Sequence, residues 1–306
     1  MIYTVTLNPS LDFITVVKDL KKGKINRSCE DSMNAGGHAI TVSRFLNILQ
    51  MPTTATGFVG GKTGAFVEDE LSRQGIAHHF IHIKENTRIN LGIFSGGMET
   101  RINGTGPHVS LEEINDLMYY LSRIREGDVV IMAGSIPKDM PPSVYSRIVE
   151  IAVVNGADFI LHVDQALVKP ILQKGPLLVT PSLEDLSEFY GQEVLTKEDV
   201  LKYGMRYFNE GPKNVLVNMG LEGSMLFAED GKIYEAGGPG KTIISTTYAD
   251  MGLVAGFVGD YMRTGNPKEA FHLAQVIGHA ACYVQTLPNM DLLRQAGEEV
   301  EILPLN

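Results

Sequence analysis

The sequence T-T-Y-A-D-M-G-L-V-A-G-F-V-G occupies residues 246–259 and does most to decide the expected fold. Polar and small residues lead to the carboxylate of Asp250, and the apolar, small-residue run after it indicates a buried helix. The N-terminus of such a helix offers free backbone N–H groups and a positive dipole end, which favour an anion. Asp250 could cap this helix or accept a proton from a substrate hydroxyl, and the segment alone leaves both roles open.

Strand-like and helix-like segments alternate along the chain before this helix. Helical patterns occur at 110–124, 142–155, 165–173, 182–190 and 197–210, with short apolar strands between them. This alternation predicts βαβ units, a mainly parallel sheet and helices on both of its faces. Ligands of such sheets bind beyond the carboxyl ends of the strands. The pattern therefore predicts one crevice lined by residues 8–12, 134–135, 164, 180–182 and 218–220.

Short β-rich pieces interrupt this alternation in the first third of the chain. Residues 12–17 and 25–33 are too close together for a helix between them, and residues 78–103 also contain only short strands. We expect these pieces to form a second, small antiparallel sheet. The chain is predicted to be one α/β domain over residues 1–306, with β-lid insertions at about 12–33 and 85–104.

The composition is that of an ordinary globular protein, with 44% hydrophobic and 20% charged residues among 306. A net charge of −10 disfavours binding to nucleic acid or to anionic membranes. The absence of a basic leader and of a long apolar run leads us to expect a cytoplasmic protein. Cys29 and Cys282 lie far apart in sequence and are expected to be reduced, structural thiols.

Several motifs in order resemble those of the ribokinase-like sugar kinases of the phosphofructokinase B family. They are T-L-N-P-S-L-D at 6–12, G-F-V-G-G-K-T-G at 57–64, T-R-I-N at 87–90, I-N-G-T-G-P at 102–107 and G-S-I-P at 134–137. The resemblance implies a ribokinase-like fold with a β lid. It also implies ATP-dependent, Mg²⁺-assisted phosphorylation of a ketohexose phosphate such as fructose 1-phosphate, tagatose 6-phosphate or fructose 6-phosphate.

The same resemblance implies roles for individual residues. On the substrate side, Asp12 would bind sugar hydroxyls, the backbone of Gly36 and Gly37 would face the sugar, and two guanidinium groups would bind the phosphate. The remaining assignments are Arg27 and Arg88 for the phosphate, Asn90 and Ser135 for completing that shell, Ser182, Asn218, Gly220, Gly223 and Ala249 for the nucleotide, and Asp185 for the metal. A homodimer through the lid is also implied.

The phosphoryl-transfer motif departs from the family pattern. The family has G-A-G-D at the helix start, whereas residues 248–251 are Y-A-D-M. Without a gap, Met251 occupies the place of the proton acceptor, and Asp250 falls one residue early, about 100° away on a helix. Asp250 is the expected base only if the helix start shifts by one residue. The alternative is an inactive relative that binds sugar phosphate or nucleotide and has a regulatory role.

Other departures lie near the same motif. His38 and Thr41 stand where this branch usually has lysine and asparagine. We expect His38 to be partly cationic near neutral pH, either in contact with a phosphate or on the surface.

Overall fold

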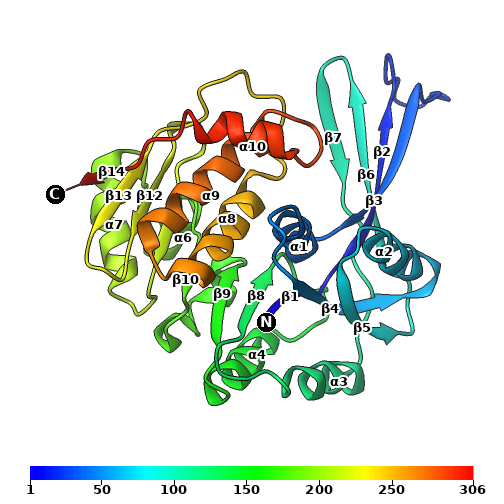
Figure 1. Ribbon diagram of the computed structural model, residues 1–306. Coiled ribbons are helices and arrows are strands. Elements are labelled where there is room, and N and C mark those ends of the chain that lie inside the picture. The colour runs from blue at the N-terminus through cyan, green and yellow to red at the C-terminus, as the bar shows by residue number, and fades with distance from the viewer. Residues whose placement is uncertain (306) are drawn as a thin grey trace.

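A ten-stranded sheet runs through the body of the protein in a computed structural model that describes residues 1–305 (Figure 1). The strand order is β14-β13-β12-β11-β10-β9-β8-β1-β4-β5, and every pairing from β11 to β5 is parallel. The strands are β1 (Ile2–Thr6), β4 (Thr53–Gly60), β5 (Ala77–Ile83), β8 (Val129–Ala133), β9 (Asp158–His162), β10 (Leu178–Val179), β11 (Val215–Asn218), β12 (Ser224–Phe227), β13 (Ile233–Ala236) and β14 (Leu303–Leu305).

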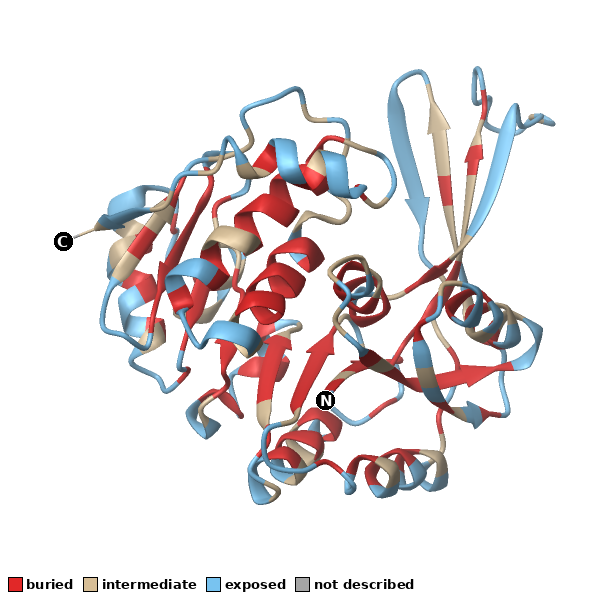
Figure 2. Cartoon of the chain, in the orientation of Figure 1, coloured by how far each residue is buried: buried red, intermediate tan, exposed pale blue. Residues whose placement is uncertain are grey.

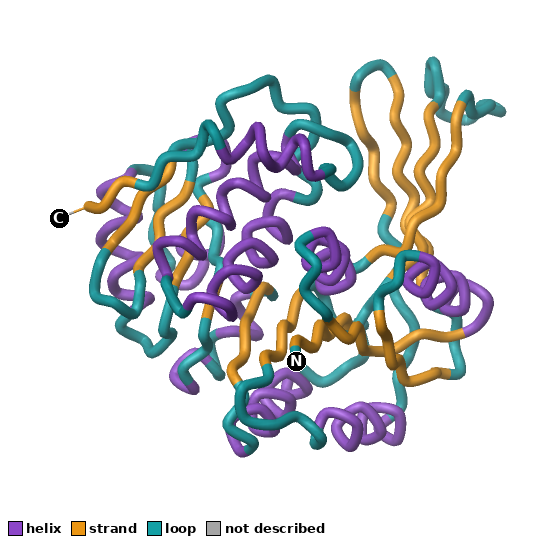
Figure 3. Tube along the Cα trace, in the orientation of Figure 1, coloured by secondary structure: helices purple, strands orange, loops and turns teal. Residues whose placement is uncertain are grey.

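Helices cover both faces of this sheet, as the alternating pattern predicts (Figure 3). One layer comprises α3 (Leu111–Leu121), α4 (Ser143–Val154), α5 (Gln165–Val168), α6 (Leu183–Tyr190) and α7 (Lys197–Phe208). The other comprises α1 (His38–Ile48), α2 (Gly61–Arg73), α8 (Ala249–Thr264), α9 (Pro267–Cys282) and α10 (Met290–Gly297). Short 3₁₀ turns lie at Leu172–Lys174 and Gly220–Glu222.

The predicted lid is a separate four-stranded sheet that projects from the body beside α1 and α2 (Figure 1). Its strands, in spatial order, are β3 (Glu30–Gly36), β2 (Ser10–Val16), β6 (Arg88–Ser95) and β7 (Met98–Ile102). The two outer pairings are antiparallel, as expected, and the central pairing of β2 with β6 is parallel. Figure 2 shows that most of the lid is exposed or half-buried, whereas α8 and α9 are largely buried.

Two parts of the chain differ from the sequence-based prediction. Residues 78–83 were expected in the small sheet, but β5 pairs in parallel with β4 and forms the edge of the main sheet. No helix or strand was predicted after residue 286, but this segment contains α10 and β14, and β14 pairs with β13. Both differences arise because pairing with a neighbouring strand, which is set by tertiary structure, outweighs weak local preferences.

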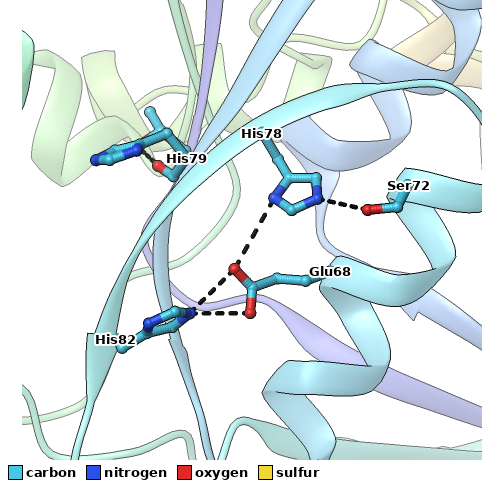
Figure 4. Close-up of polar contacts among 6 residues, drawn as sticks. Glu68, Ser72, His78, His79 and His82 are labelled. Carbon is cyan, nitrogen blue, oxygen red and sulfur yellow. Dashed lines mark hydrogen bonds and ion pairs between the residues drawn. The ribbon is translucent and has the colours of Figure 1, made fainter.

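The edge strand β5 is tied to α2 by a small polar cluster (Figure 4). His82 Nε2 lies 2.9 Å from a carboxylate oxygen of Glu68, and His78 Nδ1 lies 3.8 Å from the other. His78 Nε2 also lies 2.9 Å from Ser72 Oγ. His79 points to the opposite side of the strand, where its ring stacks on Tyr120 at 4.0 Å. Polar side chains therefore line this edge, which discourages pairing with another chain.

Small residues allow α8 to pack closely against α9. A Cβ atom at Gly256 would lie 2.5 Å from the Cα atom of Ala274, so the two backbones would have to separate. We expect Gly256→Ala to lower the free energy of unfolding by about 1–3 kcal/mol, the usual cost of overpacking. Chemical denaturation measures this change. Gly297→Ala is the matched control, because a Cβ there would meet Val276 at an ordinary 3.8 Å; equal losses in both variants would contradict the packing argument.

Candidate active site

Two pockets of about 310 Å³ each flank the N-terminus of α8. We call the first the lid pocket, because lid strands form part of its wall, and the second the helix pocket, because α8 and α9 form much of it. The lid pocket is lined by Thr6, Asn8, Ser10, Asp12, Gly37, His38, Thr41, Arg88, Asn90, Arg101, Asn103, Gly134, Ser135, Thr247, Tyr248 and Met251. The helix pocket is lined by Asn218, Gly220, Leu221, Gly223, Ser224, Pro239, Thr246, Ala249, Asp250, Leu253, Gln275, Gly278, His279 and Cys282.

Asp12 and Asn90 form the polar centre of the lid pocket. They are direct partners in the β2–β6 register, and Asn90 Nδ2 donates to Asp12 Oδ1 over 2.9 Å. Ser10 Oγ donates to the same oxygen over 2.6 Å, which holds the carboxylate in one orientation. A Cβ at Gly36 would lie 2.3 Å from the Asp12 carboxylate, so this close approach requires glycine. The carboxylate is therefore fixed by donors with one oxygen left to accept further hydroxyl groups.

Two guanidinium groups line the same pocket. Arg88 Nη1 donates to the carbonyl of Gly104 over 3.3 Å, whereas its buried Nε has no hydrogen-bond partner within residues 1–305. Burial lowers the pKa of Arg88 and the nearby Asp12 carboxylate opposes that shift, so Arg88 remains a cation. Arg101, which the sequence reasoning missed, donates through Nη2 to Thr247 Oγ1 over 2.7 Å. A second T-R-I-N motif at 100–103, repeating that at 87–90, was a signal for it.

The helix pocket contains the predicted nucleotide residues that follow β11. Asn218 Nδ2 donates to Asp250 Oδ1 over 2.5 Å, and its own Oδ1 accepts from the backbone N–H of Gly220 over 2.9 Å. Gly223 has a φ of +106°, and a Cβ there would lie 2.0 Å from the carbonyl of Ala236. Asn218, Gly220, Gly223 and Ala249 therefore come together as the resemblance implied.

The first turn of α8 turns consecutive side chains toward different pockets. Asp250 lines the helix pocket, and Met251, which is 5% exposed, lines the lid pocket. The helix begins at Ala249 with Tyr248 as its N-cap, and Tyr248 makes no side-chain capping bond. Asp250 is thus neither the N-cap nor a side chain of the lid pocket. The helical angle between residues 250 and 251 points their side chains toward different pockets.

Three other predicted residues line neither the lid pocket nor the helix pocket. Arg27 is exposed in the loop between β2 and β3, at the end of the lid far from the body (Figure 1). Ser182 and Asp185 form the capping box of α6, in which Asp185 Oδ2 accepts from both the backbone N–H and the hydroxyl of Ser182. Within residues 1–305 no cluster of three His, Cys, Asp or Glu side chains could hold a metal ion. The assignment of Asp185 to the metal stays a prediction, because Mg²⁺ is usually held by one or two carboxylates together with phosphate oxygens and water.

Two buried polar side chains in the helix pocket were also missed. Gln275 is 1% exposed and His279 is 7% exposed, and both belong to α9. Gln275 Nε2 and His279 Nδ1 have no hydrogen-bond partner in the described part of the chain. Unpartnered buried polar atoms are costly, so a polar ligand in this pocket would satisfy them. Their spacing of four residues on one helix face was visible in sequence, but nothing there showed that the face lines a pocket.

Burial should make stability depend on the protonation of His279. Desolvation lowers the pKa of His279, and this effect exceeds the opposing influence of Glu299 and of a hydrogen bond to Gly237. The unfolded chain then binds more protons as pH falls through the ordinary histidine value of about 6.5, so stability is full above that pH and falls below it. Denaturant titrations at pH 7.5 and pH 5 measure this loss, which should be smaller for His279→Gln. An unchanged pH dependence in that variant would contradict the assignment.

His38 differs from its predicted state. It begins α1, and its imidazole lines the lid pocket 5.6 Å from the ring of His162. Surrounding protein lowers the pKa of His38 to about 4 by desolvation, and His162, Arg88 and Arg101 add to the shift. The histidine is therefore neutral near pH 7, rather than partly cationic.

An open α/β sheet with two pockets at one helix N-terminus, one rich in hydroxyl-binding groups and the other in backbone N–H groups, defines a small-molecule phosphotransferase. The sequence matches the family described as pfkB family carbohydrate kinase over residues 6–287. The chain belongs to this family and is a kinase by class.

Relatives and solved structures agree with this membership. The chain is 34% identical to a 1-phosphofructokinase of Bacillus subtilis, with all of both chains covered. It is 27% identical to a D-tagatose-1-phosphate kinase of Bacillus licheniformis, again over the full length of both. It superposes on a crystal structure of phosphofructokinase-2 from Escherichia coli in complex with fructose-6-phosphate with a TM-score of 0.91, at 23% identity and with 97% and 98% of the two chains covered. Within residues 1–305, no helix has both the length and the apolar character needed to cross a membrane.

Proposed function

We propose that this protein binds a ketohexose phosphate in the lid pocket and ATP in the helix pocket, and transfers the γ-phosphoryl group slowly. The observation that carries this proposal is the first turn of α8, where Asp250 lines one pocket and Met251 the other. The shared helix N-terminus is the place where a phosphoryl group passing between the pockets would be stabilised. The side chain that faces the sugar there cannot accept a proton.

The lid pocket supports a phosphorylated sugar as the acceptor. Asp12 and Asn90 would bind sugar hydroxyls, and the backbone of Gly36 and Gly37 allows close approach of the sugar. Arg88 would bind the existing phosphate through its partly unsatisfied guanidinium fork. Ser135, whose hydroxyl accepts from Asn8 Nδ2 over 3.3 Å, lies on the same wall and would complete the shell.

The helix pocket supports a nucleotide as the donor. The loop around Gly220 and Gly223 would let the phosphates of the nucleotide approach the backbone closely. Gln275 Nε2 and His279 Nδ1 would form hydrogen bonds with polar groups of the nucleotide. Bound Mg²⁺ would neutralise charge on the phosphates, and such an ion is held mainly by phosphate oxygens and water. Ser182 and Asp185 stabilise the start of α6 nearby and would contribute at most through water.

Slow turnover follows from the side chain at position 251. Phosphoryl transfer depends mainly on positioning and electrostatics, and a positioned general base adds about 10²–10⁴ in rate. Met251 removes that contribution and leaves the positioning groups in place. The same observation favours a second candidate function, in which the protein binds both ligands as a sensor and turns over too slowly to matter.

The lid supports self-association. The face opposite Asp12 and Asn90 carries apolar side chains that are partners in the strand register, among them Phe13, Met33 and Leu91. Met33 is 53% exposed, and Ile89 and Ile102 on neighbouring strands are 52% and 58% exposed. We propose that a second copy of the chain covers this face. A role for Arg27 in phosphate binding would require that second copy, and analytical ultracentrifugation would detect it.

A coupled assay of ADP formation, paired with calorimetry, tests the proposed function. Fructose 1-phosphate, tagatose 6-phosphate and fructose 6-phosphate are compared with their unphosphorylated sugars at saturating ATP and Mg²⁺. We expect binding of at least one phosphorylated sugar, and turnover about 10²–10⁴ below that of a kinase with an intact base. Binding without any turnover would favour the sensor. Failure of all three to bind would refute both candidates.

A further inference from the structure

The lid pocket contains few groups that can accept a proton. Of its lining side chains, Arg88 and Arg101 are cations, while the hydroxyl and amide groups and Met251 are not bases at neutral pH. This leaves Asp12 and His38. The Asp12 carboxylate already accepts from Ser10 and Asn90 on one oxygen, and its other oxygen is the one left to bind sugar hydroxyls. His38 is thus the one remaining candidate among the described residues.

His38 and Met251 both line the lid pocket. It opens α1 beside Gly134, where an added Cβ would lie 3.4 Å from the Cβ of His38. Its ring is tilted by 37° against that of His162. A hydrogen bond of 2.7 Å joins His162 Nδ1 to Thr180 Oγ1. The charges of Asp250 and Asp185 act to raise the pKa of His162, against the stronger effect of burial. The two imidazoles are therefore neighbours, and His162 is close enough to Asp250 and Asp185 for their charges to act on it.

The ring nitrogens of His38 are free to act. Within residues 1–305 neither nitrogen makes a hydrogen bond, and the exposed His38 side chain lines the pocket. The charged or titratable groups that face the ring are His162 on β9, Arg88 on β6, Arg101 on β7 and Asp12 on β2. In the free protein desolvation keeps His38 neutral, and His162, Arg88 and Arg101 add to this effect; the neutral ring is the state that can accept a proton. Bound phosphates would offset those cations and stabilise the imidazolium that forms.

We propose that His38 is the catalytic base of this protein and replaces the carboxylate that is absent at position 251. This role rests on the proposed function. The sugar hydroxyl gives its proton to a ring nitrogen of His38 as its oxygen forms a bond to the γ-phosphorus. The bond between that phosphorus and the β,γ-bridging oxygen breaks, and ADP leaves with the electron pair. The proton then passes from the imidazolium to solvent through the open pocket.

A double-mutant cycle between positions 38 and 251 tests this role. His38→Gln keeps a polar side chain of similar reach but cannot take up a proton. In the native background we expect kcat to fall at least tenfold, with the KM for the sugar phosphate changed less than about twofold. In a Met251→Asp background, which supplies a carboxylate base, the same substitution should change kcat less than about threefold. In the native protein we expect kcat to rise with pH through one ionisation, and this rise should be absent in His38→Gln.

The other outcomes separate the role of His38 from the proposed function. Equal losses of kcat in both backgrounds would show that His38 only positions the substrate, and would overturn the proposal. Turnover by Met251→Asp but not by the native protein would also overturn it, while leaving the two-pocket function standing. No turnover by either protein would refute the proposed function, and the base with it. His79→Gln, on β5 outside both pockets, is the matched control and should behave like the native protein.

Discussion

Replacing Met251 with aspartate is expected to raise kcat by about 10²-fold. The side chain of residue 251 is 5% exposed and lines the lid pocket at the start of α8, where the helix dipole holds developing negative charge. A carboxylate at this position would lie beside the sugar and accept the hydroxyl proton, a contribution of about 10²–10⁴ when the base is well placed. Steady-state assays at saturating ATP and sugar phosphate measure the gain.

Asp250→Asn is the informative control for this substitution. Asp250 lines the helix pocket and accepts a hydrogen bond from Asn218, so its loss should alter nucleotide affinity more than kcat. If Asp250→Asn abolishes turnover and Met251→Asp gives no gain, then Asp250 is the base after all. The proposal that Met251 limits the rate would then be wrong.

Removing the guanidinium of Arg88 is expected to weaken sugar-phosphate binding about ten- to a hundredfold. A hydrogen bond to a charged group contributes about 1.5–3 kcal/mol, and a factor of ten in Kd corresponds to about 1.4 kcal/mol. Arg88 lines the lid pocket and has an Nε atom without a partner in residues 1–305, so much of its bonding capacity is free for a ligand. Calorimetric titration of Arg88→Ala with the preferred sugar phosphate measures the change.

Two comparisons make the Arg88 experiment specific. Affinity for ATP should stay within about twofold, because Arg88 does not line the helix pocket. Arg88→Lys keeps the charge but loses the planar fork, and should bind with an intermediate affinity. Equal losses for ATP and sugar phosphate would contradict the assignment of Arg88 to the sugar. Arg27→Ala tests the lid in parallel, since an effect there requires a second copy of the chain.

The sequence was sufficient for the order and type of most elements. Alternating apolar strands and helical patterns from 110 to 218 gave the parallel sheet and its two helix layers, because burial imposes those periods on each segment. The edge strand β5 and the C-terminal strand β14 were placed wrongly or missed. Each lies at an edge of the main sheet, so its place depends on the one neighbouring strand to which it bonds.

The candidate site divides in the same way. The resemblance to the family motifs predicted that Asp12, Gly37, Arg88 and Asn90 would share a site, and all four line the lid pocket. Tertiary structure alone placed Arg101, Gln275 and His279 beside the ligand sites and Arg27 away from them. The sequence thus determined which chemical groups the protein possesses and the spacing of apolar residues along each helix and strand. The direction of each side chain depended on where α8 begins and how the lid packs, because a single residue on a helix changes direction by about 100°.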